Sequence, residues 1–216
     1  MSIPWTEWIP MFARGAGVTL KVALLSAGVA LLMSLLAGLG SGSRFAFVRA
    51  ICRLYIQLFR AVSLLVLLFW MYFALPFAGI ELSKLLSAVL AIGLNIGAYG
   101  AEIVRGSVAA VPKGQYEASI VLNLSQSQRL WRVVFPQAFV RMLPPMGNLM
   151  IELLKATSLI YFITLADLTY EAMILRNNYY IWTPYIFGML LGIYFLLAAC
   201  ITMAIRILER KFTAWR

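Results

Sequence analysis

The chain has 216 residues, of which 63% are hydrophobic and 12% are charged. A soluble domain carries about 25% charged residues, so this composition excludes an ordinary soluble fold and predicts an integral membrane protein. The net charge of +10 would suggest nucleic-acid binding in a soluble protein, but here basic residues between apolar stretches mark topology, and we expect no nucleic-acid partner. The chain has no His, and Cys52 and Cys200 are far apart, which leaves no ligand set for a metal and no pattern for a disulfide.

Long apolar stretches follow one another along the chain, and a helix that spans a bilayer needs about 20 such residues. The opening segment, Met1–Gly17, contains Trp5 and Trp8 and suits a membrane interface. It lacks the features of a cleavable signal, so we expect it to be retained. The sequence predicts an all-α, polytopic membrane protein with a single domain over residues 1–216. Its five spans are expected at about residues 18–39, 54–75, 85–104, 138–165 and 184–205.

A polar segment over about residues 112–137 separates the third and fourth expected spans. Apolar side chains recur in it at helical spacing: Tyr116, Ile120 and Leu124. This spacing predicts a short amphipathic helix over Gln115–Leu122.

A second helix is expected directly after the first. Asn123 should end the first helix in the left-handed conformation, and Ser125 with Gln128 forms a capping box that should start the second. The second helix should end before Pro136, because the residue preceding a proline is disfavoured in the α region. The product would be two helices joined by an elbow.

The same segment has a recognisable order of residues: Gly114, Gln115, Glu117, Ala118 and Ser119, then Asn123, then Pro136, Gln137 and Ala138. This order resembles the EAA loop of permease subunits in bacterial ABC importers. The family usually has Gly where Asn123 stands and Ala where Ser119 stands. Asn adopts the same backbone conformation as Gly, and Ser is nearly as small as Ala, so both replacements fit.

The resemblance covers roughly residues 18–207. Upstream of the loop the matching residues are Asn95, Gly97, Ala98, Tyr99, Glu102, Arg105 and Gly106. Downstream they are Lys155, Thr157, Ser158 and Leu159. Together they look like the polar amino-acid branch of the family, and the runs LNIGAYGAEIVRG, VLNLS and IELLKATSLIYFITLADLTYEA look most like permeases for ectoine and hydroxyectoine. Ser63 stands where the family usually has Pro.

The resemblance implies a type I ABC importer-like fold, with a cytoplasmic coupling helix between the third and fourth spans. The residues implied to couple to an ATPase are Gly114, Gln115, Glu117, Ala118, Asn123 and Pro136. The implied partners are an ATP-binding-cassette ATPase dimer, a second permease subunit, identical or homologous, and an extracytoplasmic substrate-binding protein. No GxxxxGK[ST] phosphate-binding sequence occurs in the chain. ATP and Mg therefore belong to the partner ATPase, and this chain is expected to hold no cofactor and not to be an enzyme.

Two charged residues interrupt the apolar sequence of the fourth expected span. Glu152 and Lys155 lie three residues apart, where an ion pair can form. Each charge at the bilayer centre costs about 2.5–3.5 kcal/mol, so such residues usually face a cavity or a partner. With Thr157 and Ser158 they could form a substrate pocket that offers both charge signs to a small zwitterion. The alternative is a structural pair that fixes this helix to its neighbours.

A second group of polar residues shares one face of the third expected span: Asn95, Tyr99 and Glu102. These residues could bind substrate or form hydrogen bonds between helices. The function that the resemblance implies is import of a polar amino acid or a similar small zwitterion. The alternatives are a secondary carrier and an intramembrane enzyme with Glu102 or Glu152 as a general base.

The basic residues are distributed unequally between the two sides of the expected topology. One side receives Arg44, Arg49, Arg53, Arg60, Arg105, Lys113, Arg129, Arg132, Arg141, Arg206, Arg210, Lys211 and Arg216. The other receives Arg14, Lys21, Lys84 and Arg176. Because the side rich in Lys and Arg faces the cytoplasm, we expect a multi-pass protein of the bacterial inner membrane with its N-terminus outside and its C-terminus in the cytoplasm.

Overall fold

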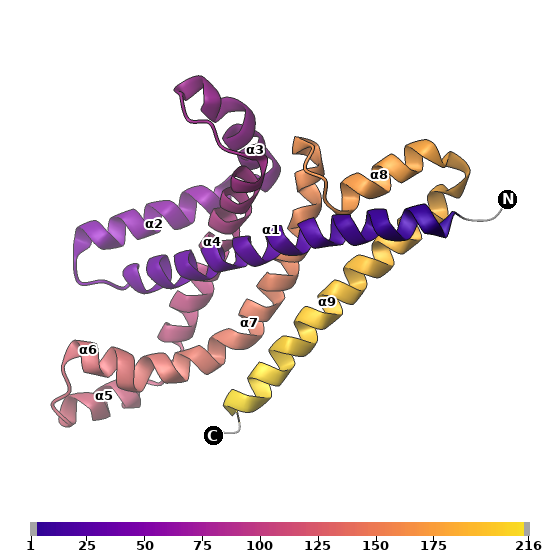
Figure 1. The fold of residues 1–216 in the computed structure, drawn as a ribbon. Helices are drawn as coiled ribbons and strands as arrows, with labels where there is room; N and C mark the ends of the chain where they lie inside the picture. Colours follow the sequence, from indigo (N-terminus) through magenta and orange to yellow (C-terminus); the bar gives the residue numbers. More distant parts are fainter. Residues whose placement is uncertain (1–3, 214–216) are drawn as a thin grey trace.

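A computed structural model describes residues 4–213 of the chain; residues 1–3 and 214–216 lie outside this description. Within the described part every regular element is helical, as the composition predicts (Figure 1). In chain order the elements are α1 (Trp5–Gly40), α2 (Ala46–Ala61), α3 (Leu64–Phe69), the π-helical η1 (Trp70–Ala74), the 3₁₀ turn η2 (Leu75–Ala78), α4 (Lys84–Ala109), α5 (Lys113–Val121), α6 (Gln126–Gln128), the π-helical η3 (Arg129–Val134), α7 (Phe135–Ala156), the 3₁₀ turn η4 (Thr157–Ile163), α8 (Leu168–Asn178), the 3₁₀ turn η5 (Tyr180–Trp182) and α9 (Thr183–Thr213).

Four helices in the described chain are long and apolar enough to cross a membrane, and a bent pair makes a fifth span if its two halves count as one. The bent pair is Ala46–Ala61 with Leu64–Ala78, and its halves meet at 103°. The break lies at Val62 and Ser63, whose backbones are extended. The expected second span, 54–75, is therefore divided between α2 and α3 in the structure and does not form a straight helix.

The aromatic opening of the chain is the first part of α1. Trp8 and Phe12 are buried against Leu168 and Leu175 of α8. Figure 1 shows the start of α1 lying next to α8 and the start of α9. Packing against α8 thus extends α1 well before residue 18, where the first span was expected to begin.

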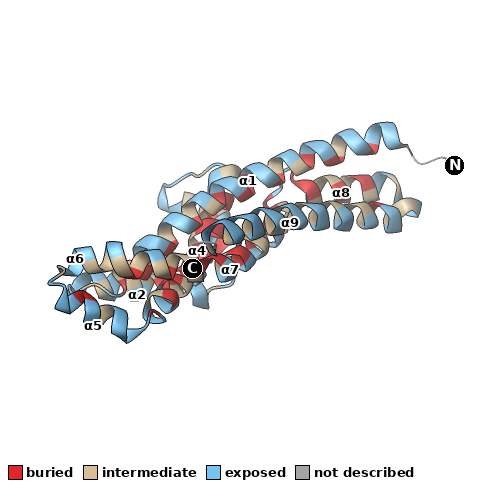
Figure 2. Ribbon diagram, turned by 90° about the horizontal axis from the view of Figure 1, so that it is seen from below, coloured by how far each residue is buried: buried red, intermediate tan, exposed pale blue. Residues whose placement is uncertain are grey.

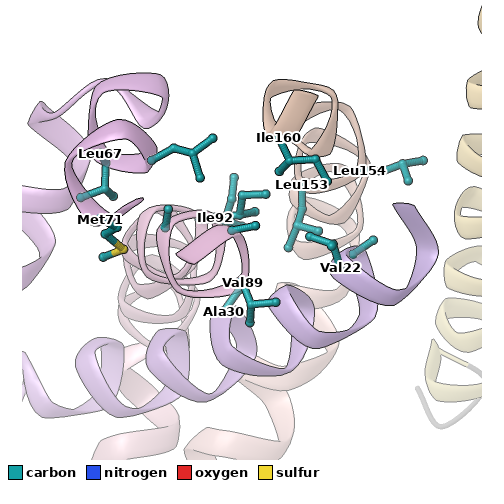
Figure 3. Packing of buried hydrophobic residues seen from close by; sticks show 14 of the residues in the cluster. Val22, Ala30, Leu67, Met71, Val89, Ile92, Leu153, Leu154 and Ile160 are labelled. Atoms are coloured by element: carbon teal, nitrogen blue, oxygen red, sulfur yellow. The ribbon is translucent and has the colours of Figure 1, made fainter. Parts of the chain in front are cut away.

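The core of the molecule is the crossing of α1, α4 and α7. Gly93 and Gly97 of α4 face α1 so closely that an added Cβ would lie 2.7 Å from Cβ of Val29 and 2.9 Å from Cβ of Met33. Small residues at a helix crossing allow this close approach. Figure 3 shows the apolar side chains that fill the crossing: Val22, Ala30, Val89, Ile92, Leu153 and Ile160.

One prediction about the segment after α5 needs correction. The second helix of the elbow does not end before Pro136, because α6, η3 and α7 follow one another without a break and Pro136 lies in the first turn of α7. The π-helical η3 shifts the hydrogen-bond register just before a residue that cannot donate, which lets the helix continue. Between the fourth and fifth expected spans, 138–165 and 184–205, the structure has a further helix, α8, which the sequence did not predict.

Candidate coupling surface and substrate groove

The elbow between α5 and α6 has the geometry that the sequence predicts. Asn123 has φ 53°, in the left-handed region, and its N–H donates to the carbonyl of Ile120. Ser125 Oγ then accepts from the Gln128 N–H at 3.3 Å, while Gln128 Oε1 accepts from the Ser125 N–H at 3.0 Å. The predicted capping box is confirmed, and it fixes the direction of the second helix.

The tip of this unit exposes apolar side chains. Ile120, Val121 and Leu122 are 54%, 82% and 71% exposed. They follow directly on the residues implied to contact an ATPase, all of which are exposed as well: Gly114, Gln115, Glu117, Ala118, Asn123 and Pro136. Three consecutive exposed apolar residues are unfavourable in water and indicate a surface that either another protein or the membrane covers.

The inner side of the unit is tied to the membrane helices. Ser119 is buried and donates from Oγ to the carbonyl of Tyr116 at 2.6 Å, so only a small residue fits there. Tyr116 packs on an apolar cluster that includes Val104 of α4 and Val134 of η3. A force applied to α5 would therefore reach both α4 and α7 through packed side chains.

Asn95 is the most constrained of the polar residues on α4. It is buried, and its Nδ2 donates to the carbonyls of Phe59 at 2.7 Å and Val62 at 3.4 Å. Both carbonyls come from the break between α2 and α3, where the helix supplies no further donors. Asn95 therefore stabilises the bend of the second span.

Tyr99 and Glu102 lie on the same face of α4, toward its C-terminal end. Tyr99 donates from Oη to the carbonyl of Arg60 at 3.3 Å, and the Arg60 guanidinium lies 5.3 Å from the Tyr99 ring centroid. Glu102 forms an ion pair with Arg105, with Nη2 and Oε2 2.6 Å apart. The face thus combines an aromatic ring, one carboxylate and two guanidinium groups.

The four candidate residues of the fourth span point in several directions. Glu152 and Lys155 are both exposed, and no ion pair joins them in the described chain. Thr157 is buried and donates to the Leu154 carbonyl at 2.7 Å, whereas Ser158 donates to the Lys155 carbonyl at 2.8 Å. Lys155 and Ser158 line a largely apolar groove of about 440 Å³ between α7 and α9.

One residue of each polar group points away from α1. A helix turns by roughly 100° per residue, so Tyr99 lies roughly 200° from Gly97 on α4, and Lys155 lies roughly 200° from Leu153 on α7. Gly97 and Leu153 pack toward α1. Tyr99 and Lys155 therefore point away from α1, whereas the buried Thr157, about one turn after Leu153, lies on the side toward α1. No hydrogen bond among the described residues links one polar group to the other.

Helix α2 contributes polar side chains to this region, which the sequence did not predict. Arg53, Gln57 and Arg60 lie beside Tyr99, Glu102 and Arg105 of α4. The available signal was the spacing of Arg49, Arg53 and Arg60, which places three guanidinium groups on one helical face. It was missed because residues 54–75 were expected to form a straight span.

Comparison with known proteins identifies the family. Residues 30–214 match the family described as the binding-protein-dependent transport system inner membrane component. The chain is 45% identical to a probable amino-acid ABC transporter permease of Sinorhizobium fredii, over 100% of this chain and 93% of that protein. It is 33% identical to the glutamine transport system permease of Escherichia coli, over 98% of both chains.

The solved structures agree with this assignment. A chain of an amino acid ABC transporter, crystallised with histidines, superimposes with a TM-score of 0.87 at 31% identity, covering 98% of this chain and 100% of that chain. A chain of the MetNI methionine ABC transporter shares the fold, with a TM-score of 0.78 at 19% identity, covering 98% of this chain and 99% of that chain. The chain belongs to the family of binding-protein-dependent inner-membrane transport components, as a permease subunit of an ABC importer of the polar amino-acid type.

Proposed function

We propose that α5 and α6 dock this permease on an ATP-binding-cassette ATPase dimer, and that Glu117 and its exposed neighbours make the contact. The observation that carries the proposal is the exposed apolar tip at Ile120, Val121 and Leu122, on a unit whose inner side is packed against α4 and α7. Closure of the ATPase would then displace the membrane helices. The complete importer contains a second permease subunit and an extracytoplasmic binding protein.

Reversing the charge of Glu117 tests this contact. Glu117→Arg should leave the chain in the membrane and reduce both co-purification with the ATPase and uptake by at least tenfold, because an exposed carboxylate becomes a repelling cation. Glu81→Arg is the matched control, since Glu81 is also exposed but lies in the connection before α4. Wild-type uptake and co-purification in Glu117→Arg would exclude the contact.

The orientation follows from the same proposal. An ATPase binds nucleotide in the cytoplasm, so α5 and α6 lie there, together with the turn after α1 and the end of α9. The N-terminus is then outside and the C-terminus inside, which agrees with the asymmetry of basic residues. A cysteine at Thr213, in a chain without Cys52 and Cys200, should react with an impermeant reagent in inside-out vesicles only; reaction in intact cells would contradict the orientation.

The cargo proposed for this subunit is a polar amino acid or a similar small zwitterion. Support comes from the polar residues on α4 and at the end of α7: Asn95, Tyr99, Glu102, Glu152, Lys155, Thr157 and Ser158. Relatives named for amino acids, including glutamine, support the same class. The resemblance to ectoine permeases stays a prediction, which uptake of labelled ectoine in competition with glutamine would test.

Exchange of the two charges on α7 distinguishes a substrate site from a structural pair. Glu152→Lys combined with Lys155→Glu keeps the net charge and the exposed positions. A substrate site should keep assembly with the ATPase and lose most uptake, because the charges that face the zwitterion are reversed. Full uptake with unchanged substrate preference would show that the pair does not bind cargo.

A further inference from the structure

Helix α2 lies among the membrane helices and not on the membrane surface. It runs back along the C-terminal half of α1 (Figure 1). Ile56 packs with Ala37 of α1 and Ala101 of α4. Arg60 is one turn beyond Ile56, which places it about 10 Å from the end of α1, within the length of the span.

The exposed surface of α2 has two opposite faces. Apolar side chains that are largely exposed form one face: Phe47, Ile51, Leu54 and Leu58. Arg49, Arg53, Gln57 and Arg60 form the other. The apolar face can contact lipid, but charged groups at this depth need water or a partner, so the basic face must line an aqueous space.

A groove of about 320 Å³ lies along this basic face, between α2, α4 and the end of α1. Its lining residues are Ser41, Arg53, Ile56, Gln57, Glu102 and Arg105. Ser41 and Ile56 are buried, while Arg53 and Gln57 are exposed and form no hydrogen bond within the described chain. Arg105 donates to Glu102 through Nε and Nη2, which leaves Nη1 without a partner there.

The charge of the groove is positive. Glu102 offsets one of the guanidinium groups of Arg53 and Arg105, and Arg60 follows directly beyond Gln57 on the same face. Anions are then the ligands that this groove fits.

We propose that this groove is the cytoplasmic exit of the transport pathway and that it binds a carboxylate of the cargo. Arg53 supplies the planar pair of donors that matches a carboxylate, and Gln57 and Nη1 of Arg105 supply further donors. The inference rests on the proposed function for its direction of transport. It adds the place at which the cargo is selected: zwitterions and anions with a free carboxylate are accepted in this groove, and cations such as polyamines are disfavoured.

Thiol reactivity in inside-out membrane vesicles tests the groove without requiring transport. Gln57 is exposed and unpartnered, so Gln57→Cys in a chain without Cys52 and Cys200 should fold normally. A sulfonate-bearing methanethiosulfonate should modify this cysteine faster than a trimethylammonium-bearing one. Adding Arg53→Gln should lower the ratio of the two rates about tenfold, since one charge within about 6 Å changes each rate about threefold in opposite directions. Adding Arg176→Gln, on α8, should leave the ratio unchanged.

Protection of the same cysteine identifies the ligand. Glutamate at constant ionic strength should slow its modification, and putrescine should not. A rate ratio that does not respond to Arg53→Gln, or equal protection by both compounds, would overturn the proposal. Protection that follows the phosphatidylglycerol content of reconstituted membranes and not glutamate would assign the groove to a lipid phosphate and overturn it as well. Failure of the ATPase contact would leave these rates unaffected, so the two proposals fail separately.

Discussion

Asp167 is a buried carboxylate that caps the start of α8. Its side chain is fully buried at the start of α8, where Oδ1 accepts from the Tyr170 N–H at 2.9 Å and Oδ2 has no partner within the described chain. Burial raises the pKa of Asp167 to about 6. The next residue contacts α1, since the Leu168 N–H donates to Thr19 Oγ1 at 3.1 Å. Asp167 thus combines a helix cap with a carboxylate that is costly to ionise.

The raised pKa predicts a pH-dependent stability. The pKa of Asp167 in the folded protein lies above the ordinary value of about 3.9. The contribution of Asp167 to the free energy of unfolding is therefore complete below about pH 4 and is lost as the pH rises through 6. A difference of about two pH units corresponds to about 3 kcal/mol at most. Asp167→Asn keeps a capping side chain and cannot ionise, so it should raise the apparent Tm of the purified protein at pH 8 and change it little at pH 4.5. An equal shift at both pH values would contradict this assignment.

At the scale of elements, local sequence predicted those features that depend on a few neighbouring residues. Asn123 and the pair Ser125 and Gln128 determine the elbow by their own backbone and side-chain hydrogen bonds, and the structure has both. The prediction that the second helix ends before Pro136 was wrong, because no short sequence motif predicts the π-helical stretch before this residue. The bend after Ala61 also went unpredicted, since it depends on Asn95, distant in sequence, which satisfies the carbonyls of the break.

Close packing of α1 on α4 gives a testable prediction at the scale of elements. Gly97→Ala would place a methyl group 2.9 Å from Cβ of Met33, and overpacking of this kind costs about 1–3 kcal/mol. Gly106→Ala is the matched control in the same helix, because nothing lies within 4 Å of its added Cβ. The apparent Tm should fall for Gly97→Ala and remain level or rise for Gly106→Ala, since Ala favours helix over Gly. Equal effects would show that α1 and α4 do not pack this closely.

The whole molecule separates a packed centre from surfaces left for partners and lipid. Buried residues concentrate where α4 and α7 cross α1, whereas α9 and the α5–α6 end are largely exposed (Figure 2). Composition and the order of motif residues predicted the class of protein, and local motifs predicted the elbow between α5 and α6. They did not predict the basic groove on α2, because its formation requires the bend that brings Arg53 and Arg60 beside α4.

The central claim is that the tip of the α5–α6 unit seats on an ATPase in the cytoplasm. A photo-crosslinking residue at Val121, which is 82% exposed, measures this directly in membranes of cells that express the whole importer. The predicted result is a single main crosslinked partner, identified by mass spectrometry as a nucleotide-binding ATPase, with a yield that changes when nucleotide is added. Crosslinks to lipid alone, or to a protein on the outer side of the membrane, would contradict the account.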